Sequence, residues 1–510
     1  MKKLIFVLFF FILAISFSLN AQLKPVGYCG TTVEDQYFIK ERMLANREYF
    51  KNKPLPRPEA ITYIPIRYFL VAKDDGTGRI SDEKVYENLC GINKIYITQN
   101  LSFYLKEIKY INNTSMWENG SASLSAQRIN QFNLQNKNAV NVFCVNVANG
   151  SELGVLAFYN RVNDYIVCGN PHVIPNGTTL AHEIGHYFSL NHTFYGWEND
   201  DYNTITMNCT KTTPMSTSTG ILVEYVDRNK TVGTQKQCYL SADGFCDTPA
   251  DYNLGFGWNG CTYSGCAKDP DEVKLNPDEK NIMSYFLDCL EYFSEEQKDA
   301  ILKDLNSAKR NFLRSSVYTP KLDLAGSVNY ISPKIGEIVA GYNEVKFEWA
   351  AVPDAEFYFV TIGGNPTFTL YPQSFKTART DTVITNLRKS SSIYWKVYPV
   401  NANSFCMKGA TVNFKTPAFG VATNEVVKNK ISISNIVQSG SDVEFIINSD
   451  YPDNIQIQLQ NSIGQNLNSI KYQIEAGSQS ISIPNCIPGI YTYNIDNKNS
   501  RLKSGKIVLY

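Results

Sequence analysis

The chain has no net charge and few histidines. Its 510 residues carry 48 lysines and arginines against 48 aspartates and glutamates. A nucleic-acid-binding protein needs a basic surface to displace counterions from phosphate, so this balance argues against one. The 43 % hydrophobic and 19 % charged residues exclude an acidic disordered chain and are ordinary for a protein with a folded core. Of only 4 histidines, three fall within one short segment.

Long apolar runs are scarce too, since the only one lies at the N-terminus. Met1-Lys2-Lys3 is basic, Leu4 to Phe17 is almost wholly apolar, and Ala21 is a small residue at the end of this stretch. The order predicts a secretory signal peptide over residues 1–21. The alternative is a membrane anchor, which needs a span of about 20 apolar residues. We therefore expect a mature chain without a transmembrane segment, exported to a compartment where its 12 cysteines can form disulfides.

Changes in composition divide the rest of the chain. Residues 22–57 are polar and lead into three closely spaced prolines, Pro54, Pro56 and Pro58, which mark a linker after an N-terminal segment. Over residues 58–316, strand-like and helix-like runs alternate, which predicts one α/β domain. Short strand-like runs separated by turn residues follow, and they predict two all-β sandwiches at residues 328–417 and 424–510.

The histidine cluster has the spacing of a metal site. Residues four apart on a helix share one face, so His182 and His186 can hold one ion, with Glu183 beside them to take a proton from water. His192 can reach the same ion only if the helix ends near Ser189. Three imidazoles and an open position predict a catalytic zinc site. The alternative is a helix with incidental histidines. It is disfavoured because three of the chain's 4 histidines would then have to fall at these spacings by chance.

This spacing resembles that of the metzincin clan of zinc proteases. The segment Asn281-Ile282-Met283-Ser284-Tyr285 is similar to the clan's methionine turn. The resemblance implies that Met283 lies beneath the metal and that Tyr285 donates a hydrogen bond to the tetrahedral intermediate. Three further matches over residues 28–315 resemble the pappalysin family: the segment 246–249, Cys289 shortly after the turn, and the segment 293–297.

The pappalysin resemblance implies a fold and an activity. The fold is of the α/β (α+β) class: a metzincin-type catalytic domain with a twisted mixed sheet and an active-site helix. The activity is that of a zinc metalloendopeptidase, a hydrolase acting on peptide bonds in protein or peptide substrates. One position departs from the pattern, because Ser189 stands where the family usually has a glycine in a left-handed conformation. That change puts the rigidity of His192 in doubt.

The resemblance also implies binding sites near the metal. Gly154, Val155, Leu156 and Ala157 would form an edge strand that pairs with an extended substrate, or are simply a core strand. Asp288 would be an acid in the S1′ pocket that favours Arg or Lys after the scissile bond, or is a solvated turn residue. An oxygen-rich segment would bind Ca²⁺, or is a plain surface loop; its candidate ligands are Asp243, Asp247, Thr248 and Asp251.

Two disulfides are implied by the family, Cys246 with Cys266 and Cys261 with Cys289, although spacing alone does not establish pairing. A third could join Cys209 to Cys238. The remaining pair, Cys144 and Cys168, could lie on adjacent strands as free or paired thiols.

Cys29 has a different setting, after the signal peptide and ahead of the prolines. A thiolate is a good zinc ligand, and this placement resembles the cysteine switch that keeps metzincin zymogens latent. Residues 22–57 would then be a propeptide, and activation would need cleavage between about Lys51 and Arg57. The alternative is a disulfide from Cys29 to a cysteine such as Cys90.

The two β modules resemble known export and linker modules. Residues 345–349 and 394–397 resemble a fibronectin type III sandwich with core tryptophans. Residues 481–491 and 506–509 resemble the C-terminal sorting domain of the type IX secretion system, whose machinery would be a partner. We therefore expect a protein that is secreted or at the cell surface. Two functions fit: a zinc endopeptidase made as a zymogen, or a surface adhesin with a vestigial protease domain. The intact Glu183 favours the first.

Overall fold

The computed structural model describes residues 28–509 except 54, 56–57, 151–153, 199–211, 316–317, 322–323, 325–326, 403, 407–408, 421–430, 440, 462–465 and 498–500. The predicted signal peptide, Cys209 and part of the proline-rich linker lie outside the described residues. Among the described residues, no helix combines the length and apolar character needed to cross a bilayer.

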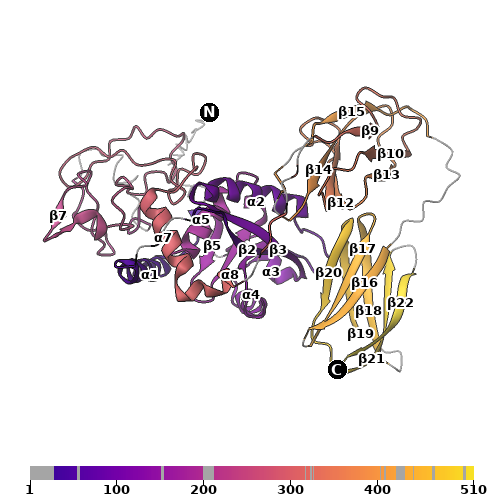
Figure 1. The fold of residues 1–510 in the computed structure, drawn as a ribbon, viewed down its shortest axis with the longest axis horizontal. Coiled ribbons are helices and arrows are strands. Elements are labelled where there is room, and N and C mark those ends of the chain that lie inside the picture. Colours follow the sequence, from indigo (N-terminus) through magenta and orange to yellow (C-terminus); the bar gives the residue numbers. More distant parts are fainter. Residues whose placement is uncertain are drawn as a thin grey trace, which may run out of the picture.

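A six-stranded mixed sheet forms the centre of the first 315 residues (Figure 1). Its strands, in spatial order, are β1 (Tyr28–Cys29), β5 (Val155–Asn160), β6 (Tyr165–Gly169), β4 (Val140–Val145), β2 (Thr62–Ala72) and β3 (Leu101–Asn112). Only β5 and β6 pair antiparallel, and the other neighbours are parallel. Strand β2 is buried from Ile64 to Ala72, as expected for a central parallel strand covered on both faces.

Helices cover both faces of this sheet. One face packs on α2 (Asp82–Tyr96), α5 (Thr178–Tyr187) and α7 (Glu295–Asn306), and the other on α3 (Thr114–Glu118) and α4 (Ser123–Gln135). Ser81 caps α2 by accepting from the Lys84 N–H, and a capping box between Ser294 and Gln297 begins α7. The remaining helices are α1 (Val33–Phe50), α8 (Asn311–Arg314), and the 3₁₀ turns η1 (Ile97–Gln99), η2 (Asn170–His172), η3 (Gln237–Tyr239) and η4 (Ala308–Arg310).

A loop-rich stretch between α5 and α7 lies at one end of the molecule (Figure 1). Its described part contains the short hairpin of β7 (Thr231–Val232) and β8 (Gln235–Lys236). The predicted disulfide Cys261–Cys289 is present, with Cα atoms 5.5 Å apart. The predicted pairing of Cys246 with Cys266 is wrong. The turn after η3 brings Cys238 back to Cys246, with Cα atoms 5.1 Å apart, and these two form the disulfide.

The other cysteines of the first module have settled states as well. Cys144 on β4 and Cys168 on β6 lie opposite each other, and both are free and buried. Cys266 is disulfide-bonded, although not to Cys246. Cys238 pairs with Cys246, so the alternative of a bridge from Cys238 to Cys209 is excluded.

The two C-terminal modules are built only of antiparallel sheets in their described parts. The first has the orders β13 (Asp381–Thr385), β10 (Glu344–Trp349), β9 (Tyr330–Ser332), and β12 (Gln373–Thr377), β11 (Phe357–Gly363), β14 (Ser392–Val400), β15 (Val412–Lys415). Trp349 and Trp395, predicted to be core residues, are 1 % and 0 % exposed. Both sheets contribute to one hydrophobic cluster around these tryptophans, so they pack face to face.

The last module follows the same plan. One sheet has the order β16 (Ile431–Ser439), β17 (Asp442–Ser449), β20 (Gly477–Ile483). The other has the order β19 (Asn466–Ile474), β18 (Asp453–Asn461), β21 (Gly489–Asn497), β22 (Arg501–Leu509). Burial alternates along β17 and β20, which is typical of strands with one face in a core. The fold class is therefore a mixed α/β module followed by antiparallel β modules.

The first β module is joined to α2 covalently and by aromatic packing. A disulfide links Cys90 of α2 to Cys406, so the alternative pairing of Cys90 with Cys29 is excluded. Tyr86 of α2 packs against three aromatic rings of the β module at 5.4 to 5.9 Å, those of Phe357, Phe359 and Phe405. Figure 1 shows that the last module lies at the same end of the molecule as this β module, away from the loop-rich stretch.

The last module contacts β3 through polar groups. The Asn112 side chain donates to the Lys471 carbonyl at 2.5 Å, and Lys109 lies 3.6 Å from Glu444. Glu475 is in the same contact region. Its burial, followed by the charge of Asp82, raises its pKa from 4.5 to about 7, although Arg79 acts in the opposite direction.

This raised pKa predicts how pH affects the contact. Between pH 4.5 and 7 the folded chain holds the Glu475 proton more tightly than the unfolded chain. Stability must therefore fall as pH rises through that window. We expect Glu475→Gln to raise stability at pH 8 by about 1 kcal/mol and to change little at pH 4.5.

Calorimetry of the full chain at both pH values measures this effect. Glu444→Gln is the matched control, because it removes a neighbouring carboxylate that is paired with Lys109. An equal shift at both pH values for Glu475→Gln would contradict the expectation.

Candidate metal centre

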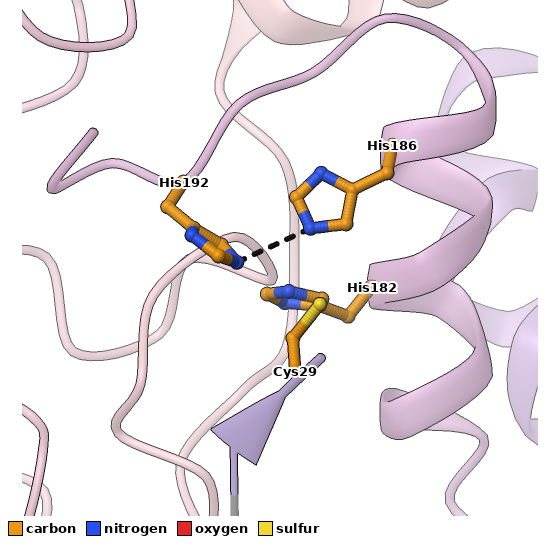
Figure 2. A group of neighbouring side chains, drawn as sticks. All are labelled: Cys29, His182, His186 and His192. Atoms are coloured by element: carbon orange, nitrogen blue, oxygen red, sulfur yellow. Dashed lines mark hydrogen bonds between the residues drawn. The ribbon is translucent and has the colours of Figure 1, made fainter. Parts of the chain in front are cut away.

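Helix α5 carries three of the predicted site residues, and the turn after it brings in the fourth. His182, Glu183 and His186 lie on the helix, which ends at Tyr187. Ser189 follows with a left-handed φ of 71°. The chain then reverses, and the Leu190 N–H donates to the Gly185 carbonyl at 2.9 Å. Figure 2 shows His192 returning from this loop to face the two helix histidines.

Four ligand atoms converge at this place. Those of Cys29, His182, His186 and His192 all lie within 4.8 Å of one another, and all four residues are buried (Figure 2). The Nε2 atoms of His186 and His192 are 3.2 Å apart. His182 Nε2 is buried without a hydrogen-bond partner. Among the described residues, no other group of three or more His, Cys, Asp or Glu side chains converges in this way.

Acceptors behind the three rings determine which nitrogen faces the centre. His182 Nδ1 lies 2.7 Å from the Ile282 carbonyl, and His186 Nδ1 lies 2.7 Å from the Leu190 carbonyl. Since a carbonyl only accepts, each Nδ1 donates and each Nε2 keeps its lone pair. His192 Nδ1 lies 3.1 Å from a Glu198 carboxylate oxygen in the same manner. This arrangement orients imidazoles toward a metal ion.

Burial keeps the imidazoles neutral. Desolvation, with a smaller contribution from His192, lowers the pKa of His182 to about 3. Desolvation also lowers the pKa of His192 to about 3. Metal binding requires neutral imidazole, so the rings are ready to coordinate at physiological pH. The orphaned Nε2 of His182 and the all-nitrogen and sulfur donor set fit a zinc ion.

Glu183 lies beside the four ligand atoms and is only 1 % exposed. Burial raises its pKa to about 8, while hydrogen bonds from Cys29 and Thr31 act to lower it. The Thr31 hydroxyl donates to Glu183 Oε2 at 3.5 Å. The carboxylate is therefore close to the centre without belonging to the set of convergent ligands.

The predicted methionine turn packs directly against α5. A Cβ atom at Gly185 would lie 2.5 Å from the Met283 sulfur, so a larger residue there would force the Met283 side chain to shift. The Ile282 carbonyl, next to Met283, holds His182. The Tyr285 ring lies 5.0 Å from the His192 ring, and its hydroxyl accepts from the Cys29 N–H at 3.0 Å.

The predicted substrate edge is paired with the chain's own N-terminal segment. Strand β1 runs parallel to β5, opposing Tyr28 to Val155 and Cys29 to Ala157. The Tyr28 N–H donates to the Gly154 carbonyl at 3.0 Å, and the Gly30 N–H donates to the Ala157 carbonyl at 2.8 Å. The segment Gly154, Val155, Leu156 and Ala157 therefore presents backbone groups that an extended chain can pair with.

The other predicted binding residues are less concentrated. Asp288 is exposed beside Cys289. Asp247 accepts from Ser294 and from the Glu296 N–H, which occupies it at the start of α7. Asp243 accepts from the Thr248 hydroxyl, and Asp251 accepts from Thr193. Among the described residues, these carboxylates do not form one convergent ligand group.

Two residues that contact His192, Glu198 and Gln36, were not predicted from the sequence. Glu198 lies six residues beyond His192, and its second oxygen accepts from the Gly196 N–H at 2.8 Å. Gln36 of α1 is 0 % exposed, and its Nε2 lies 3.3 Å from His192 Nδ1. Nothing in the spacing of either residue distinguishes it from an ordinary polar side chain.

Comparisons with known proteins place the last module. Residues 441–510 match the family model of the secretion system C-terminal sorting domain. No curated protein matches the chain. A mutant of Tannerella forsythia promirolysin shares 14 % identity at a TM-score of 0.37, over 56 % of this chain and 96 % of that one.

Two further solved structures are similar to part of the chain. Domains FN1–FN3 of chicken CNTN1 share 13 % identity at a TM-score of 0.17, over 38 % of this chain and 70 % of that one. The fn3 domain of human collagen alpha-1(XX) shares 14 % identity at a TM-score of 0.16, over 22 % of this chain and 99 % of that one.

The match to the sorting domain confirms the prediction for the C-terminus: the protein is secreted, with attachment at the cell surface.

Proposed function

We propose that this chain is a secreted zinc metalloendopeptidase that hydrolyses peptide bonds in proteins and is made as a latent zymogen. The observation that carries the proposal is the convergence of three buried, neutral imidazoles with Glu183 on the same helix. The fold and site support the pappalysin resemblance, with residues 58–316 as the catalytic domain. Domain limits of 22–57 for the propeptide, 328–417 for a fibronectin type III-like sandwich and 424–510 for the sorting domain belong to the same proposal.

The ligands and catalytic groups have distinct tasks in this reading. His182, His186 and His192 would hold the zinc, which when bound supplies a Lewis acid that acidifies water and polarises the scissile carbonyl. Glu183 takes the proton from the attacking water and passes it to the leaving amine. The Tyr285 hydroxyl donates to the developing oxyanion. Met283 packs beneath Gly185 and holds the floor of the site.

Latency follows from what the N-terminal segment covers. Cys29 brings its sulfur into the ligand group, and β1 occupies the edge of β5. Thr31 contacts the base Glu183. Substrate and segment would therefore compete for the same backbone edge and the same open position.

The same segment is anchored outside the site as well. Arg42 of α1 donates to the His186 and Tyr187 carbonyls at 3.2 and 2.8 Å, which are at the end of α5. Lys40 donates to the Ser241 carbonyl at 2.9 Å. Helix α1 also lies beside α7 (Figure 1). These contacts hold Cys29 in place until the segment is cut from the chain.

The enzyme reading is tested by removing the base. After propeptide removal, Glu183→Ala should lose at least about 100-fold activity in casein or gelatin zymography, because proton transfer contributes about that factor or more. Its zinc content should equal that of the wild type, since Glu183 is not among the convergent ligands. Equal zymogram signals from both proteins would refute the enzyme reading and favour a vestigial protease domain in an adhesin.

The switch is tested in the uncut chain. Cys29→Ala should raise peptide hydrolysis above that of the uncut wild type, because the sulfur no longer competes for the open position. Cys486→Ala is the matched control, since Cys486 is also a buried cysteine that forms no disulfide but lies in the last module. Continued latency of Cys29→Ala would sink the cysteine switch.

The role of Asp288 is tested with peptides that vary at P1′. If Asp288 binds a basic side chain, Asp288→Asn should lower kcat/KM about 10-fold for Arg or Lys peptides and leave Leu peptides unchanged. Glu291→Gln is the control, because it removes another exposed carboxylate from the same loop between Met283 and α7. No advantage of basic P1′ residues in the wild type would remove the proposed role.

A further inference from the structure

The turn that brings His192 to the centre is built on a serine. Ser189 has φ 71°, a conformation that L side chains disfavour and that glycine usually supplies after a helix. It is only 1 % exposed. Its hydroxyl donates to Asp304 Oδ1 at 2.7 Å and accepts from Arg42 Nε at 2.6 Å. The side chain therefore has an anchor that a glycine could not have.

Asp304 is itself fixed in place. It lies in the last turn of α7 and is 0 % exposed, and its second oxygen accepts from Arg310 Nε at 3.0 Å. Burial alone would raise the Asp304 pKa, but Arg42 and Arg310 hold it below its ordinary value. Arg310 is buried with its guanidinium 3.6 Å from the Tyr187 ring and is also paired with Asp164. Ser189 is thus tied to a rigid, charged network rather than to a mobile side chain.

The turn at Ser189 affects two of the proposed ligands. It carries the carbonyl that holds His186, and it leads into His192. The Leu190 carbonyl, adjacent to Ser189, is the acceptor for His186 Nδ1 at 2.7 Å. His192 follows two residues later on the same short loop (Figure 2). A shift at Ser189 would therefore disturb both imidazoles at once.

We propose that Ser189 and Asp304 are positioning residues that hold His186 and His192 for the metal ion, in place of a glycine turn. The inference rests on the proposed zinc site. It does not depend on latency: Arg42 belongs to the removable segment, whereas the Ser189–Asp304–Arg310 chain of hydrogen bonds lies wholly within residues 58–316. The anchor would therefore persist after activation.

Two substitutions at one position separate the anchor from the backbone strain. Ser189→Ala keeps a side chain in the left-handed conformation but loses the hydrogen bonds with Asp304 and Arg42. Ser189→Gly loses the same bonds but relieves the strain. Ser307→Ala is the matched control, because the Ser307 hydroxyl has no hydrogen-bond partner in the described structure.

The readouts are zinc release from the full chain to a chromophoric chelator and amide hydrogen exchange across residues 188–192. We expect Ser189→Ala to release zinc about 10-fold faster than the wild type and to lose exchange protection in the turn. The zinc release rate of Ser189→Gly should lie between those of the wild type and Ser189→Ala. Ser307→Ala should release zinc at the wild-type rate. Asp304→Asn should release zinc at least as fast as Ser189→Ala, because it weakens the contact with Ser189 and also removes the charge that Arg42 and Arg310 face.

The result that would overturn the proposal is Ser189→Ala with wild-type release and protection. Equal rates for Ser189→Ala and Ser189→Gly that exceed the wild type by less than twofold would overturn it too. Failure of the proposed function is a different result: the wild type would then bind no zinc through His182, His186 and His192. Hydrogen exchange on the metal-free chain reports on the turn in either case.

Discussion

The constraint on which this structure depends is the burial of three imidazole nitrogens that face one another. Buried polar atoms without partners are costly. Because the Nδ1 atoms are hydrogen-bonded on the outer side, the Nε2 atoms face the centre, and that of His182 has no hydrogen-bond partner there. A cation between them would satisfy all three at once. Helix α5 carries His182 and His186, and the left-handed turn at Ser189 brings His192 back to them. The Met283 turn packs against the same helix and holds His182 through the Ile282 carbonyl.

The N-terminal segment uses the features that would make the site reactive. Its strand takes the unpaired edge of β5, its thiol enters the ligand group, and its helix contacts the carbonyls at the end of α5. The segment therefore meets the site through β1, the Cys29 thiol and α1 rather than at one atom. In the zymogen reading, loss of the sulfur alone opens the coordination position and permits partial hydrolysis, whereas full substrate access also requires β1 to leave the sheet edge.

The two β modules are attached by different chemistry. The first is bound to α2 by the Cys90–Cys406 disulfide and by aromatic packing around Tyr86, which is characteristic of a permanent interface. The last contacts β3 through hydrogen bonds and ion pairs, including Lys109 with Glu444. Contacts of this kind are weaker and respond to pH and salt. The contact of the last module with β3 is therefore the more sensitive of the two to pH and salt.

The sequence by itself determined what depends on neighbours along the chain. The His182-Glu183…His186 spacing, the core tryptophans and the short strands of the two β modules are all local patterns, because helix and strand periodicity is set within a few residues. Tertiary structure alone decided the rest. The Cys90–Cys406 disulfide spans 316 residues, and Cys246 found Cys238 because a loop turned back. Glu198 and Asp304 meet the site only through the path of the folded chain, and a polar side chain carries no mark of the partner that folding will bring to it.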